Sequence, residues 1–170
     1  MADDIDIKSF FDYTEDDLKQ TLDKGVYQLK ITSAEAGRKD NGNPTLDTRC
    51  VVAGGEFAGR FGPIKSWEFG DVSGTRNSDG SEFHIPAKDN RLNLIRDVRA
   101  ILDGDELVLS SPDTYDEVMM AEIARQIAGR EFFAAVAPSA SGWDRMGKIS
   151  PLSDPPKGVV SAELAAEFEF

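Results

Sequence analysis

Hydrophobic and polar residues alternate along three successive segments in the first half of the chain. The first two segments place most of their larger apolar side chains on one face, and glycine, asparagine and proline separate one segment from the next. Period-two alternation with such breaks is typical of strands joined by hairpins. The pattern predicts an antiparallel meander that begins a curled sheet or small barrel. Its strands are expected at 25–31, 46–52 and 64–69.

The periodicity changes to that of a helix after the third strand. Apolar residues recur on one helical face from Leu94 to Leu102, which predicts a helix from Lys88 to Leu102. A second helix is expected to begin between Ser111 and Thr114 and to end at Gly129. Residues 71–82 lack periodicity and are predicted to form a long exposed loop.

Two further segments, 130–137 and 143–150, are rich in strand formers. The order is therefore three strands, a helical insertion and two strands. This order predicts a mainly β fold, a five-stranded OB-fold-like barrel with helices between strands three and four. The expected domains are an acidic N-terminal arm at 1–23, the barrel at 24–150, and a linker with an acidic tail at 151–170.

Charge is unevenly distributed over the chain, whose net charge is −12. Residues 1–23 hold eight acids and two lysines, and residues 154–170 hold four acids and one lysine. The body between them carries only −3. An acidic chain argues against nucleic-acid binding. That argument is weaker here, because acidic and basic residues are nearly equal in number in the body of the chain.

The scarcity of cysteine and histidine limits the chemistry. One cysteine, Cys50, and one histidine, His84, cannot form an intrachain disulfide or a Cys/His zinc cluster. Cys50 shares one face of its strand with Leu46 and Val52, which are expected to point into the core, so a buried thiol is favoured. We therefore expect no enzyme activity, no cofactor and no metal site. The acidic N-terminus and the lack of a long apolar run predict an intracellular, cytoplasmic protein with no membrane partner.

Aromatic and cationic residues coincide on the predicted strands. Single-stranded nucleic acid is bound by aromatic rings that stack on bases and by cations that contact phosphates. If Ile64 points into the barrel, Trp67 is displayed beside Lys65; the alternative is that Trp67 belongs to the core. The candidate DNA-binding residues are Arg38, Lys39, Arg49, Arg60, Lys65, Trp67, Trp143, Arg145 and Lys148.

The C-terminus carries a different signal. A segment rich in proline leads to an acidic sequence with two phenylalanines, Glu167, Phe168, Glu169 and Phe170. This pattern is typical of a partner-binding peptide whose rings fill apolar pockets. The alternative is a short helix at 161–168 that packs on the body.

Several of these segments together resemble a known family. The sequences GVYQLKI (25–31), GNPTL (42–46), GEFAGR (55–60) and GREFF (129–133), with the helical insertion between them, resemble bacteriophage single-stranded DNA-binding proteins and a related, poorly characterised family from phage replication and recombination gene clusters. The ending EFEF (167–170) looks like the tails by which such proteins recruit replication and recombination proteins, although it has fewer acids.

The resemblance implies a non-enzymatic protein that binds single-stranded DNA without sequence preference during phage replication or recombination, in the cytoplasm of the bacterial host. An alternative is an acidic interaction module that binds a basic host or phage protein and no DNA. The N-terminal arm could then serve as an autoinhibitory segment or as a docking segment. The oligomeric state, homodimer or higher, is left open.

Overall fold

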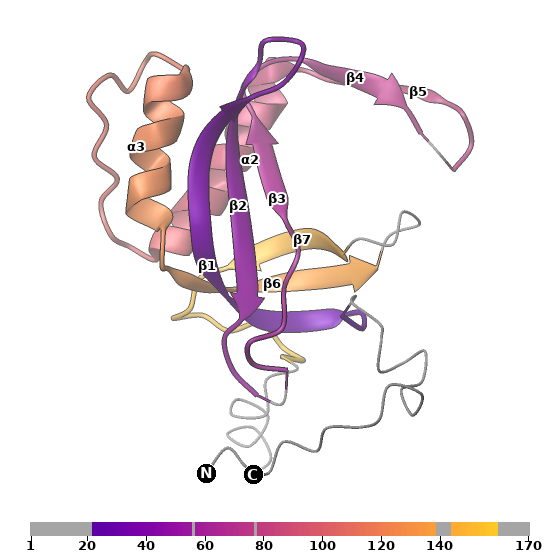
Figure 1. Ribbon diagram of the computed structural model, residues 1–170, viewed down its shortest axis with the longest axis vertical. Coiled ribbons are helices and arrows are strands. Elements are labelled where there is room, and N and C mark those ends of the chain that lie inside the picture. Colours follow the sequence, from indigo (N-terminus) through magenta and orange to yellow (C-terminus); the bar gives the residue numbers. More distant parts are fainter. Residues whose placement is uncertain (1–21, 56, 77, 139–143, 160–170) are drawn as a thin grey trace, which may run out of the picture.

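A five-stranded antiparallel sheet forms the body of the protein (Figure 1). The computed structural model describes residues 22–55, 57–76, 78–138 and 144–159. The strand order is β3-β2-β1-β6-β7. The strands are β1 (Gly25–Arg38), β2 (Pro44–Val52), β3 (Lys65–Glu68), β6 (Glu131–Pro138) and β7 (Asp144–Ser150). The expected mainly β class is confirmed, with a nearly closed, barrel-like sheet.

The long strand β1 makes the sheet curl. Its first part pairs with β6, and its second part pairs with β2, with the register shifting between Ile31 and Ser33. Such a bulge bends a strand and increases its twist. The two halves of the sheet therefore turn toward each other, and β3 and β7 become its two edges. No ladder joins these edges within the described residues, so the barrel stays open there.

Two helices, α2 (Ala87–Leu102) and α3 (Glu117–Ile127), lie between β5 and β6 in the chain and pack against the sheet (Figure 1). The predicted α2 is confirmed, and its apolar stripe is buried. The predicted start of α3 is wrong. That helix begins at Glu117, and the carboxylate of the preceding N-cap residue, Asp116, accepts a hydrogen bond from the Met119 amide and so caps the first turn.

The inward faces of the strands form one core with the buried faces of both helices. The predicted inward positions of β1 and β2 are confirmed, since Tyr27, Leu29 and Ile31 are buried together with Leu46 and Cys50. Neither α2 nor α3 has the length and apolar character that a membrane-spanning helix needs.

The folded unit is wider than the expected 24–150. Leu22 is 0% exposed, and its amide donates a hydrogen bond to an Asp144 carboxylate oxygen at 3.0 Å. At the other end, Val159 is buried and forms a parallel bridge with Val26. Both termini of the expected domain therefore continue into the core. The rest of the N-terminal arm and of the C-terminal tail lies outside the described residues.

The predicted exposed loop at 71–82 is instead the start of a projecting hairpin (Figure 1). Its strands are β4 (Val72–Thr75) and β5 (Glu82–Ile85). A Cβ added at Gly74 would lie 2.9 Å from the Phe83 ring, so this ring lies directly on the glycine. The Arg76 guanidinium lies 5.6 Å from the centre of the same ring. The hairpin is stabilised by this cross-strand stack, which a search for alternation over such short strands does not reveal.

Replacing Phe83 with alanine should loosen the hairpin and leave the body intact. An isolated two-stranded hairpin is marginally stable, and an aromatic cross-strand contact contributes up to about 1 kcal/mol, or roughly fivefold in an opening equilibrium. The Arg76 amide, which donates to the Ser81 carbonyl, should then exchange its hydrogen about fivefold faster. Amides of the β1–β2 ladder are the internal control. Unchanged exchange at Arg76 would contradict a stabilising role for the ring.

Candidate functional site

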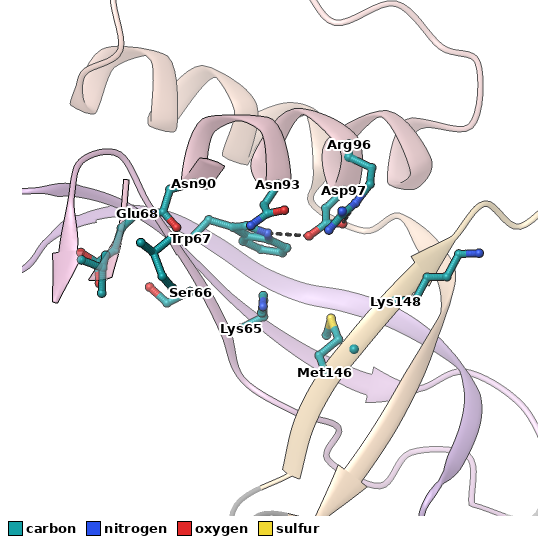
Figure 2. A pocket seen from close by; sticks show the side chains of 13 residues that line it. Lys65, Ser66, Trp67, Glu68, Asn90, Asn93, Arg96, Asp97, Met146 and Lys148 are labelled. Carbon is teal, nitrogen blue, oxygen red and sulfur yellow. Dashed lines mark hydrogen bonds and ion pairs between the residues drawn. The ribbon is translucent and has the colours of Figure 1, made fainter. Parts of the chain in front are cut away.

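A groove of about 660 Å³ lies where β3, α2 and β7 meet (Figure 2). It occupies the open side of the barrel, because β3 and β7 are the two unpaired edges of the sheet and α2 packs against both. Three cations from three different elements line it, Lys65 of β3, Arg96 of α2 and Lys148 of β7. Asn90 and Asn93 add amide groups from the helix. Two carboxylates, Glu68 and Asp97, line it as well, and Asp97 forms an ion pair with Arg96. The groove therefore combines hydrogen-bond donors with one more cation than carboxylates.

The indole of Trp67 forms part of the groove wall and is 5% exposed. Its Nε1–H donates a hydrogen bond to Oδ2 of Asp97 at 2.9 Å (Figure 2). Of the two alternatives for Trp67, the structure shows the second: the side chain belongs to the core and is not displayed on an outer surface. Directly opposite residues of an antiparallel pair share a face, and Trp67 lies opposite the buried Leu46. It is Ile64 that points outward, 56% exposed.

Asp97 is a buried carboxylate that sequence reasoning missed. It is 6% exposed, and besides the indole it accepts a hydrogen bond from Nε of Arg96 at 3.4 Å. A buried charge is costly unless it is hydrogen-bonded, so both donors stabilise Asp97 where it is. The signal in the sequence was an acid within the apolar stripe of α2, directly beside Val98. Asp97 thereby orients the indole of Trp67 and holds Arg96 at the groove.

The cations at the tip of the β1–β2 hairpin already have acidic partners. Nε of Arg38 lies 3.0 Å from Oε1 of Glu117, and Nζ of Lys39 lies 3.6 Å from Oε1 of Glu68. The hydrogen bond from Arg38, reinforced by its charge, holds the pKa of Glu117 below its usual range. The Arg38–Glu117 pair is exposed, and exposed ion pairs contribute about 0–1 kcal/mol. In the second pair the Glu68 side chain is only 15% exposed.

The remaining predicted residues divide between the groove and other surfaces. Lys148 lines the groove together with Lys65 and Trp67. Arg49 is exposed on the outer side of β2, and Arg145 is exposed on β7 outside the groove lining. The Arg60 guanidinium lies 5.4 Å from the centre of the Phe57 ring. Trp143 and the tail residues lie outside the described residues, and their predicted roles stay predictions. These tail residues are Glu167, Phe168, Glu169 and Phe170.

Besides Asp97, α2 contributes three polar groove residues that were not foreseen, namely Arg96, Asn90 and Asn93. All three lie on the polar side of α2, where charged and amide side chains are common. Their positions in the sequence therefore do not mark a binding site. They become candidates because α2 packs across the open side of the barrel, which is a tertiary property.

The described residues offer little for metal binding or nucleophilic chemistry. Among them, no group of three or more His, Cys, Asp or Glu side chains is placed to hold a metal ion. Burial raises the pKa of the Cys50 thiol to about 12, so this sulfur is a poor nucleophile at neutral pH. His84 lies on the exposed β4–β5 hairpin, where Nδ1 is 2.8 Å from the Ser73 hydroxyl.

Comparison with known protein families finds no family that matches this chain, and a search of curated proteins finds no match either.

Proposed function

We propose that the chain is an OB-fold protein that binds single-stranded DNA without sequence preference in phage replication or recombination. Two observations support the OB fold. The strand order β3-β2-β1-β6-β7 fits a partly open, five-stranded Greek-key barrel, and the helices are inserted after its third strand. Such barrels bind oligonucleotides in many unrelated proteins.

The observation that carries the proposal is the convergence of Lys65, Arg96 and Lys148 on one groove. Contacts with phosphates position a nucleic acid without reading its sequence. Asn90 and Asn93 add neutral donors to the same groove. Because the opening is bounded by a helix and two strands, an extended single strand fits it better than a duplex, whose phosphates lie on two separated backbones.

The charge distribution is compatible with this role. The net charge of −12 is concentrated in the two ends, and the body carries −3. A near-neutral body can hold a polyanion against a local cluster of cations. We further propose that Glu167, Phe168, Glu169 and Phe170 recruit replication or recombination proteins through apolar pockets with basic rims.

Titration with poly-dT should quench tryptophan fluorescence at low salt and lose affinity as salt is added. For single strands, log affinity falls against log salt with a slope of about 0.7 per phosphate contacted. Three groove cations predict a slope of at least about 2. Duplex DNA of equal length, titrated alongside, should bind more weakly. If neither fluorescence nor electrophoretic mobility changes with poly-dT at low salt, the proposal is wrong.

A second candidate function is an acidic interaction module that binds a basic protein, and the net charge of −12 favours it. Deleting residues 1–21 discriminates the two functions, because it removes seven acids and two lysines and spares the buried Leu22. A DNA-binding protein should bind poly-dT more tightly after this deletion. An interaction module would lose its basic partner and still not bind DNA.

A further inference from the structure

The outer face of the β1–β2–β3 meander carries an exposed aromatic ring that the groove does not use. Phe61 is 83% exposed, more than any other large hydrophobic side chain in the described residues. Leaving a phenylalanine in water forgoes the favourable free energy of burial. Single exposed apolar side chains are common on protein surfaces, so whether this ring contacts a ligand depends on the residues around it.

The backbone that carries this ring is firmly held. The Gly62 amide donates to the Cys50 carbonyl at 2.9 Å, and the Val52 amide donates to the Arg60 carbonyl at 2.9 Å. A Cβ added at Gly62 would lie 3.2 Å from the Leu29 side chain, so the chain runs close against the barrel here. Phe61 is therefore presented from a rigid support, which lowers the entropy lost when a ligand binds.

Cations flank the ring on the same face of the sheet. Phe61 forms a bridge opposite Val51, and Val51 lies opposite Lys30 in the next strand. Opposite residues and residues two apart on a strand share a face, so Lys30 and Arg49 point to the same side as Phe61. Both are exposed, and neither has an ion pair within the described part of the chain.

Three carboxylates lie on this face as well, Glu35, Asp47 and Glu131. The Ser66 hydroxyl donates a hydrogen bond to Oδ1 of Asp47 at 2.6 Å, and the side-chain amide of Gln28 donates one to Glu131 at 3.0 Å. These acids lie farther from the ring than the cations do, because Glu131 is one strand beyond Lys30 and Asp47 is two residues beyond Arg49 along β2. The charges nearest the ring are therefore positive.

We propose that Phe61 stacks on a base of single-stranded nucleic acid and that Lys30 and Arg49 contact the phosphates on either side. This inference rests on the proposed function and adds a second contact surface to it. The segment that carries Phe61 leads directly into β3, the edge strand whose Lys65 lines the groove. A strand of DNA that leaves the groove can turn around this edge onto the outer face.

The shape of the face favours a base over a peptide. A peptide anchor needs a pocket that encloses its side chain, whereas a base stacks on an open ring. Phe61 lines neither the groove nor the cavity of the β4–β5 hairpin. The combination of a flat ring and two unpaired cations is the one that single-stranded nucleic acids require.

The test compares Phe61→Leu with Phe61→Trp in the full-length chain. Phe61→Leu keeps the apolar character and removes the ring, so affinity for oligo-dT should fall about tenfold. The salt slope should not change, because no phosphate contact is lost. Phe61→Trp should keep the affinity within about twofold and should add a fluorescence signal that oligo-dT quenches. Arg49→Gln should lower the salt slope by about 0.7.

The outcomes separate this inference from the proposed function. Val118→Ala, which trims an exposed apolar side chain on α3, is the matched control and should bind like the wild type. If the wild type binds oligo-dT and Phe61→Leu binds equally well, stacking at Phe61 is overturned and the proposed function stands. That result would assign the face to a protein partner. If the wild type does not bind oligo-dT at all, the proposed function and this inference both fail.

Discussion

Replacing Lys65, Arg96 and Lys148 together with glutamine is expected to weaken poly-dT binding about 100-fold at 0.1 M salt. Each cation that contacts a phosphate releases condensed counterions, which for single strands contributes about 0.7 to the slope of log affinity against log salt. Loss of three contacts should therefore lower the slope by about 2. Glutamine keeps most of each side chain's stem, so the groove keeps its shape. Titrations at several salt concentrations measure both quantities.

A second triple variant controls for net charge. Replacing the exposed Lys24, Arg99 and Lys157 with glutamine removes the same three charges away from the groove. This control should lose little affinity, and its slope should stay near that of the wild type. If both triple variants weaken binding equally, the DNA responds to overall charge, and the groove is not the binding site.

Replacing Trp67 with alanine should lower the free energy of unfolding by about 3–5 kcal/mol. The indole is buried between the sheet and α2, and its removal leaves a cavity. The change also removes one of the two hydrogen-bond donors to the buried Asp97 carboxylate. Since domains of this kind are stable by only about 5–15 kcal/mol in total, urea denaturation should show a large shift of the midpoint.

Trp67→Phe isolates the hydrogen bond from the packing. The phenyl ring retains most of the buried area, and the loss of the indole donor to Oδ2 of Asp97 should lower the free energy of unfolding by about 1–3 kcal/mol. In a double-mutant cycle, Asp97→Asn combined with Trp67→Phe should cost less than the sum of the single changes, because the two residues share one interaction. A cost below about 1 kcal/mol for Trp67→Ala would contradict its place in the core. Trp67→Phe also assigns any remaining DNA-induced quenching to Trp143.

Much of the sheet follows from local patterns. The alternation in β1 and β2 correctly places Tyr27, Leu29 and Cys50 inside, because a period of two leaves each side chain one of two faces. The apolar stripe of α2 is equally direct. The β4–β5 hairpin was missed because its stability comes from one cross-strand contact, that of Phe83 with Gly74, and not from an extended pattern.

The third strand illustrates where pattern reasoning ends. Its alternation separates Lys65 and Trp67 from Ile64, but it does not say which group faces the core. Pairing decides this, since the register places Trp67 opposite the buried Leu46. The same pairing turns Ile64 outward, while a separate bridge to Val51 places Phe61 on the outer face of the sheet.

The sequence by itself determined the five barrel strands and the two helices, the mainly β class, the charge asymmetry and two of the three groove cations. These properties depend on local periodicity and composition, which can be read from residues that are close together in the sequence. Only the tertiary structure decided that Trp67 is buried, that Asp97 accepts its hydrogen bond, and that Arg96 joins Lys65 and Lys148 in one groove. These contacts depend on strand register and on how α2 packs across the open side of the barrel. They join residues that are far apart in the chain, so they form only when the whole core is formed.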